Sequence, residues 1–301
     1  MPISTVNGVS FSALTRVNGV LKVSIVLVNG VSNFDSDAQA FITAAGITGS
    51  TQQGAINTLV TSLKSNSLWT KMDAIYPFVG GTSTTHKFNL KNPADTNGAF
   101  RLVFNGGMTH DSNGVTFNGT TGYADTNWAS NPQTTSTDYI SLSLYSRTDS
   151  RTATIRTDMA VQNFNYNGTT GGLWLSSYYN TGSPSIIFQN DLPSSYTYAY
   201  WAANGTNTNT TGYYVGIQNS TTIAVYRNGT LMGSNNSAYS ASRSYSTSNV
   251  FIGADNYNGG ARRYSDRNLA FAHIGTSMTS TDAGNLYTII QTYQTTLGRQ
   301  V

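Results

Sequence analysis

Hydrophobic and polar positions alternate in short runs over most of the chain. From about residue 76 onward, runs rich in aromatic and β-branched residues alternate with clusters of Gly, Asn, Ser and Thr, as strands alternate with turns. No helix-length pattern separates these runs, so they indicate an antiparallel sandwich rather than βαβ units. The predicted strands are residues 100–104, 139–145, 173–179, 186–189, 213–218, 223–227 and 250–253.

A short repeat occupies the start of the chain. Val-Asn-Gly-Val occurs at residues 6–9, 17–20 and 28–31. Asn-Gly is the favoured two-residue hairpin turn, because both residues tolerate positive φ. A strip of this length has too little core to be stable alone. We therefore expect residues 1–33 to anchor or oligomerise the protein, and the alternative is an ordinary meander packed on the main domain.

Helical periodicity follows the repeat. Asp35 or Ser36 can cap a helix over residues 37–45, and Ser50 or Thr51 can cap a second one. The second helix has one apolar face at i, i+3 and i+4 spacing, formed by Ala55, Ile56, Leu59, Val60 and Leu63.

A last helix, over residues 282–297, is expected to cover an edge or an end of the sheets. The pattern divides the chain into a repeat strip (1–33), a helical connector (34–75) and a β-sandwich (76–301). The first part would carry assembly, and the last part would carry any binding site.

Composition agrees with β structure and excludes several classes of protein. Only 10% of the 301 residues are charged, and the sequence contains no Glu, so common helix formers are scarce. Zero cysteines exclude disulfides, thiolate metal sites and thiol nucleophiles. The net charge of +3 comes without a basic cluster, which argues against nucleic acid as a partner. No apolar run is long enough to span a membrane, and no classical signal peptide is visible at the start.

Four segments in order resemble a known superfamily. Residues 222–231, with Tyr-Arg-Asn-Gly-Thr-Leu, are similar to a hairpin of concanavalin A-like and laminin G-like lectin domains. Residues 250–253 resemble that superfamily's Ile-Gly strand, residues 268–275 its final core strand, and residues 286–297 its terminal segment. The resemblance implies an all-β fold, namely an antiparallel concanavalin A-like jelly-roll sandwich.

The N-terminal part carries a second resemblance. The Val-Asn-Gly-Val strips, followed by residues 37–47 and 63–80, look like bacteriophage virion proteins with a docking region and an outward lectin-like domain. This implies a fibre- or spike-type protein on the virion surface that binds host-surface glycan and contacts other virion proteins through residues 1–33. It also implies a homotrimer. The alternatives are a structural decoration or cement protein without a ligand, and an Asp-based glycan hydrolase.

Catalytic residues are not expected. Glucanases of the same superfamily need two nearby carboxylates and place Glu at alternate positions of one strand, and this chain has no Glu. The pairs Asp149 with Asp158 and Asp255 with Asp266 are formally available, but neither has the i, i+2 spacing that puts two carboxylates on one strand face. We therefore expect a binding protein and no enzyme.

Candidate ligand-binding residues are aromatic side chains, which stack on sugar rings, and arginines, which hold acidic groups. Alternation places Tyr196 and Tyr198 on one face of a strand and Trp201 on the other. The remaining candidates are Tyr257, Arg262 and Arg263.

One loop offers oxygen ligands of the kind that Ca²⁺ prefers. Asp255, Asn256 and Asn258 stand directly before Gly259-Gly260. The same residues also make an ordinary turn, so calcium is the one candidate cofactor and a plain hairpin is the alternative.

Overall fold

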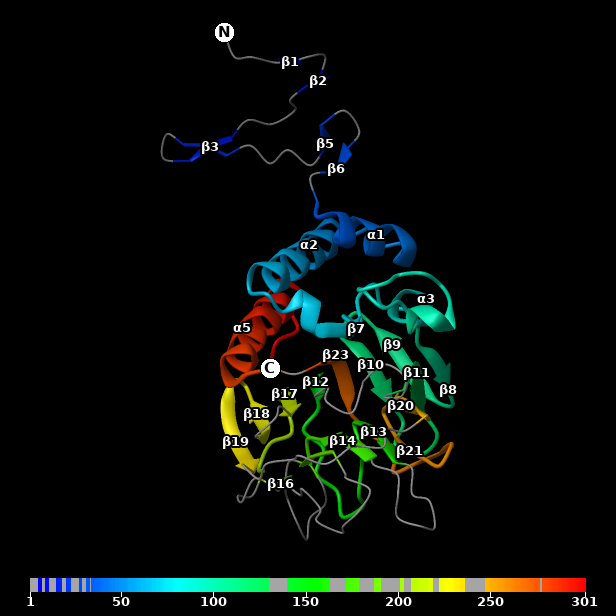
Figure 1. The fold of residues 1–301 in the computed structure, drawn as a ribbon. Coiled ribbons are helices and arrows are strands. Elements are labelled where there is room, and N and C mark those ends of the chain that lie inside the picture. The colour runs from blue at the N-terminus through cyan, green and yellow to red at the C-terminus, as the bar shows by residue number, and fades with distance from the viewer. Residues whose placement is uncertain are drawn as a thin grey trace.

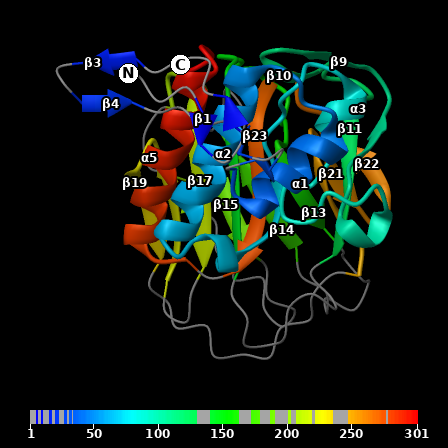
Figure 2. The same cartoon turned by 90° about the horizontal axis from the view of Figure 1, so that it is seen from above.

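The computed structural model arranges the chain as two stacked sheets with a layer of helices on one of them (Figures 1 and 2). No helix of the described part is long and apolar enough to cross a membrane. The structure describes six short strands within residues 1–33 and then residues 34–129, 140–162, 172–178, 187–190, 201–202, 207–218, 222–235, 247–276 and 278–301.

Each Val-Asn-Gly-Val repeat lies in a hairpin. In all three, the valine before Asn-Gly pairs with the valine after it, as expected for a two-residue connection. The hairpins pair β1 (Thr5–Val6) with β2 (Val9–Ser10), β3 (Thr15–Val17) with β4 (Val20–Lys22), and β5 (Leu27–Val28) with β6 (Val31–Ser32).

The first large sheet has eight strands. They are β7 (Met72–Tyr76), β9 (Met108–Asp111), β10 (Gly114–Phe117), β12 (Ile140–Ser146), β17 (Gly212–Gln218), β18 (Ile223–Arg227), β19 (Thr230–Asn235) and β23 (Asn268–Thr276). Their order is β19-β18-β17-β12-β23-β10-β9, with β7 paired to β23 on the same side as β10. Strand β23 is therefore central, because it pairs with three other strands.

The second sheet has nine strands. They are β8 (Val103–Asn105), β11 (Tyr123–Ala129), β13 (Met159–Gln162), β14 (Gly172–Ser176), β15 (Ile187–Asn190), β16 (Trp201–Ala202), β20 (Asn249–Ile252), β21 (Asp255–Tyr257) and β22 (Gly260–Arg262). The order is β16-β15-β14-β13-β20-β11-β8, and β21 joins β13 in parallel and β22 in antiparallel pairing. The predicted antiparallel β-sandwich is thus confirmed.

The central strands of the eight-stranded sheet, β12, β17 and β23, are buried on both faces. On β12, Leu142 and Leu144 point into the core between the sheets, whereas Tyr145 points to the opposite side. On β17, Tyr214 faces the core between the sheets and Tyr213 faces away from it. Strand alternation thus supplies two separate cores from one sheet.

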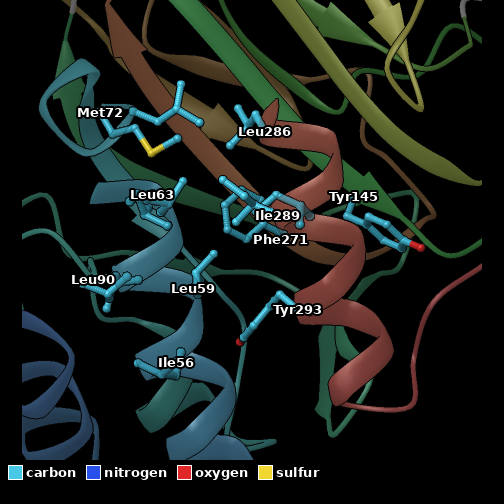
Figure 3. Close-up of a cluster of buried hydrophobic side chains, with 14 of the residues drawn as sticks. Ile56, Leu59, Leu63, Met72, Leu90, Tyr145, Phe271, Leu286, Ile289 and Tyr293 are labelled. Carbon is cyan, nitrogen blue, oxygen red and sulfur yellow. The ribbon is translucent and has the colours of Figure 1, made fainter. Parts of the chain in front are cut away.

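Helices cover the face opposite the sandwich core (Figure 2). In Figure 3, Leu59 and Leu63 of one helix meet Leu286 and Ile289 of another above Phe271 of β23. The helical elements are α1 (Ser36–Ala45), α2 (Ser50–Ser65), η1 (Trp69–Lys71), α3 (Ser83–His86), η2 (Asn97–Ala99) and α5 (Ser280–Thr296).

Two expectations about these helices need correction. Helix α5 packs on the face of the sheet rather than on an edge or an end, because its apolar side completes the helix-layer core. The expected boundary at residue 76 falls at the end of β7, whose residues 72–75 pair with β23. Residues 34–75 are therefore packed against the sandwich, and they supply one of its strands.

A buried ion pair ties the two sheets together at one end. Arg267 immediately precedes β23, and Asp158 immediately precedes β13. Both side chains are 0% exposed. Nη1 of Arg267 donates to Oδ1 of Asp158 over 2.9 Å, and Ser265 and Ser177 also donate to this carboxylate. Every charge at this point is thus paired inside the protein.

Two histidines are buried and neutral. His273 lies on β23 beneath the helix layer, where its ring nitrogens contact the hydroxyls of Ser141 and Ser143. Burial lowers the pKa of His273 to about 3. Burial also lowers the pKa of His86 to about 3; its Nε2 accepts from the Gly81 amide and its Nδ1 lies 3.1 Å from Nδ1 of His110.

These histidines predict that the protein loses stability below pH 6.5. In the unfolded chain each histidine is protonated with a pKa near 6.5, whereas in the folded protein it is protonated only near pH 3. Lowering the pH therefore favours the unfolded state. Each histidine should cost about 1.4 kcal/mol of unfolding free energy per pH unit between these values. Urea unfolding at pH 7.5, 6 and 5 measures this slope. A shallower slope in His273→Gln would support the assignment, and a wild-type free energy constant over this range would contradict it.

Candidate functional site

The outer face of the nine-stranded sheet carries a row of functional side chains. Residues of β13 and β14 alternate, so that Val161 and Leu173 enter the sandwich core while Ala160 and Trp174 point away from it. Pairing then continues the outer row: Trp174 lies opposite Ala160, Ala160 beside Asp255, and Asp255 opposite Arg262.

The neighbouring outer row contains two positions without a side chain. Gly172 lies opposite Gln162, Gln162 beside Tyr257, and Tyr257 opposite Gly260. Gln162 and Tyr257 thus each face a glycine on the neighbouring strand.

A chain reversal brings the two halves of the site together. Residue 252 of β20 pairs antiparallel with β13, and residues 255–257 return alongside β13 in parallel. Gly253, between them, has φ +83°, a conformation that side chains other than glycine rarely adopt. A Cβ at this position would also clash with the ring of Phe117. The sequence Gly253-Ala254 thus places Asp255 beside Ala160 and Tyr257 beside Gln162.

Charged groups converge on Asp255. Its carboxylate is 0% exposed, and Oδ2 accepts from Nε of Arg262 at 2.8 Å and lies 3.6 Å from Nη1 of Arg263. Burial raises the pKa of Asp255, and the hydrogen bond from Arg262 opposes this rise. Oε1 of Gln162 accepts from Nη2 of Arg262 at 2.8 Å. We call Gln162, Trp174, Asp255, Tyr257, Arg262 and Arg263 the outer-face cluster.

Both arginines of the cluster rest on aromatic rings. The guanidinium carbon of Arg262 lies 3.4 Å from the ring centroid of Tyr257, and that of Arg263 lies 4.9 Å from the ring of Trp174. Such stacking suits the flat guanidinium group. Arg263 has φ +55°, a left-handed backbone conformation that costs a residue with a side chain about 1–2 kcal/mol. Strained residues of this kind concentrate at ligand-binding sites.

A group of aromatic rings adjoins the cluster. Tyr123 of β11 stacks on Phe251 of β20 with ring centroids 4.5 Å apart, and Tyr264 lies 6.5 Å from Tyr123. Tyr123 and Tyr264 are half-buried, so each keeps part of its ring in solvent. The hydroxyl of Tyr264 donates to the carbonyl of Ala261.

The structure brings together three of the predicted ligand-binding residues: Tyr257, Arg262 and Arg263. Tyr196 and Tyr198 lie outside the described residues. Trp201 lies in β16, at an end of the same sheet, where only the backbone is described. Whether any of these six binds a ligand stays a prediction.

The candidate calcium ligands form a hairpin. Asn256 donates from Nδ2 to the carbonyl of Asn249 and accepts the amide of Gly259, while Asn258 occupies the turn with φ +50°. Asp255 already faces two arginines, whose positive charge opposes a cation at the same oxygen. Among the described residues there is no group of three or more His, Cys, Asp or Glu side chains that could hold a metal. The arrangement favours the turn.

Two members of the cluster were not predicted as site residues. Gln162 and Trp174 belong to β13 and β14, almost a hundred residues before Tyr257. The available signal was alternation: Leu173 and Leu175 flank Trp174, which indicates that the tryptophan faces away from a core formed by the leucines.

The carboxylates considered for hydrolysis are all engaged elsewhere. Asp158 is inside the sheet-linking ion pair, and Asp255 is inside the outer-face cluster. Asp266 pairs with Arg156 at 3.2 Å, and Asp149 pairs with Arg151 at 3.0 Å. Asp158 and Asp255 are 0% exposed, whereas Asp149 and Asp266 keep 35% and 26% of their side chains in solvent.

Comparison with known proteins identifies the fold. No protein-family model matches the sequence, and no curated protein matches it. Botulinum neurotoxin type C, a toxin that depends on interaction with two ganglioside molecules, is similar with a TM-score of 0.52 and 10% identity over 75% of this chain and 53% of that chain. A receptor binding domain has a TM-score of 0.50 and 11% identity, over 75% and 52% of the two chains.

A third structure is shorter and covers nearly its whole length. Domain 4 of AbnA, a GH43 extracellular arabinanase from Geobacillus stearothermophilus, in complex with arabinotriose, has a TM-score of 0.47 and 12% identity, over 72% of this chain and 98% of that chain. The present chain spans only about half the length of the other two structures. At these identities the likeness shows the fold alone, a β-sandwich.

The two buried carboxylates should respond differently to neutralisation. Asp158→Asn strands the fully buried Arg267, so it should lower the free energy of unfolding by about 3–5 kcal/mol. Asp255→Asn should cost only about 1 kcal/mol, because Arg262 and Arg263 are 36% and 28% exposed and can be rehydrated. Urea unfolding of both variants tests this order. Equal losses would contradict the distinction between a structural pair and an accessible one.

Proposed function

We propose that this protein binds carbohydrate through the outer-face cluster and the aromatic rings beside it. The observation that carries this proposal is the combination of half-exposed Tyr123, Tyr257 and Tyr264 with fixed polar groups on the same side of one sheet. A sugar presents apolar C–H faces and a rim of hydroxyls. It is therefore recognised by aromatic rings together with a few precisely placed hydrogen-bonding groups.

The fold supports this proposal. Domains of similar architecture include that of a neurotoxin that interacts with gangliosides. Sheet geometry also supports it, because the helix layer covers the outer face of the eight-stranded sheet whereas the outer-face cluster retains exposed arginines. A rigid sheet holds binding groups more precisely than a loop does.

The biological setting that we propose is the surface of a bacteriophage particle. Support comes from the resemblance of the N-terminal part to virion proteins and from the three hairpins of residues 1–33, which are short for independent stability. In this setting residues 1–33 contact other virion proteins and hold a homotrimer, while the sandwich binds host-surface carbohydrate.

Glycan binding is tested by an array of neutral and acidic glycans probed with the full chain. Tyr257→Ala removes the ring under Arg262 and should weaken binding at least tenfold, the loss expected for one stacking contact worth about 1.4 kcal/mol. Arg101→Ala is the control, because Arg101 is an exposed, ion-paired arginine outside the cluster. Absence of binding to every glycan would reject the proposal and favour a decoration protein.

The oligomeric state tests the role of the repeats. Light scattering of the full chain should give about three times the chain mass of 32.3 kDa. Replacing Val17 and Val20 by Asp puts charges on a paired position of the second hairpin and should reduce the trimer to monomers. A wild-type chain that stays monomeric at micromolar concentration would contradict the assembly role.

A further inference from the structure

Arg262 is held in one orientation before any ligand arrives. Nε is bonded to Asp255, Nη2 is bonded to Gln162, and the guanidinium plane rests on the ring of Tyr257. Among the described residues, Nη1 of Arg262 donates no hydrogen bond, and the side chain is 36% exposed. Because the fold already immobilises this side chain, binding a ligand would cost little further side-chain conformational entropy. Its remaining N–H groups can donate to an acceptor on the ligand.

The cluster contains more positive than negative charge. Arg262 neutralises Asp255 at 2.8 Å. Arg263 adds a second guanidinium at 3.6 Å, and its backbone is left-handed. Its side chain is supported by Trp174 and is 28% exposed. Even with Asp255 ionised, the cluster carries a net charge of +1.

The negative group of the cluster is buried beneath its positive groups. Asp255 is 0% exposed, whereas both arginines reach solvent. A ligand approaching the sheet therefore meets guanidinium groups first, and the net positive charge of the cluster attracts an anion.

We infer that the outer-face cluster recognises a sugar that carries a carboxylate, such as a uronic acid or a sialic acid. This inference rests on the proposed carbohydrate binding and names its ligand class. The planar carboxylate of the sugar accepts hydrogen bonds from the outward N–H groups of Arg262, with Arg263 adding attraction, and the sugar ring lies toward the half-exposed tyrosines. Gln162 and Asp255 act as positioning residues, because they hold Arg262 rather than the ligand.

Matched pairs of oligosaccharides test this inference by isothermal titration calorimetry on the full chain. The probes are tri-galacturonate against its methyl ester, and 3′-sialyllactose against lactose, so that the two sources of carboxylate are measured separately. At least one acidic probe should bind ten or more times tighter than its neutral partner, and the preference should shrink as salt rises from 50 to 300 mM.

Variants separate recognition of the carboxylate from general binding. Arg262→Gln should abolish the preference for the acidic probe while the weaker binding of the neutral partner is retained. Arg262→Lys should keep part of the preference, since it preserves the charge but loses the planar fork. Arg101→Gln, the control, should change neither affinity, and the melting temperature of each variant verifies that it is folded.

The outcomes distinguish this inference from the proposed function. Equal affinity for acidic and neutral probes, or a loss of both in Arg262→Gln, would overturn the carboxylate inference and leave carbohydrate binding intact. Failure of every probe and of the wider glycan array would overturn both.

Discussion

The eight-stranded sheet is apolar on both faces, and neither face can be left in contact with water. Alternate residues of β12, β17 and β23 supply the core of the sandwich and the core beneath the helices. One face is covered by the second sheet and the other by α1, α2 and α5. The helices at the two ends of the globular part are therefore structural partners of the sheet, and the arrangement explains why a largely β protein keeps them.

This arrangement assigns different roles to the two outer surfaces. The helix layer closes one side with apolar contacts, as the packing of Leu59, Ile289 and Phe271 shows (Figure 3). On the other side, the outer residues of the nine-stranded sheet include the outer-face cluster, in which Gln162, Trp174 and Asp255 are buried while Arg262 and Arg263 reach solvent. This side is organised by polar contacts around the buried carboxylate of Asp255.

Local pattern predicted much of the fold. The strand at residues 223–227 and the helix at 37–45 match β18 and α1 closely, because alternation in the first and a capping aspartate, Asp35, in the second are local signals. Strand β7 was missed, since its five residues follow a helical stretch and continue its apolar content. Its identity as a strand is set by pairing with β23, about two hundred residues later.

In the candidate site too, local groupings could be predicted from the sequence and distant ones could not. Tyr257, Arg262 and Arg263 are close in sequence and could be grouped from it, and the turn at Asn258 was likewise a local alternative. Gln162 and Trp174 could not be grouped with them. Their proximity depends on the parallel pairing of β13 with β21, which results from the reversal at Gly253. A register between distant strands is not encoded in any short segment.

The position of β23 has a consequence for how the protein is made. This strand pairs with β7, β10 and β12, yet it follows every other described strand of the two sheets in the sequence. Until residues 268–276 are synthesised, the backbone N–H and C=O groups with which its three partners pair to β23 have no strand beside them, and α5 follows later still. Folding of the sandwich must therefore wait for β23 and proceed through contacts that are distant in sequence, which makes it slow. The nascent chain is exposed to aggregation until then, and its scarcity of long apolar runs limits that hazard.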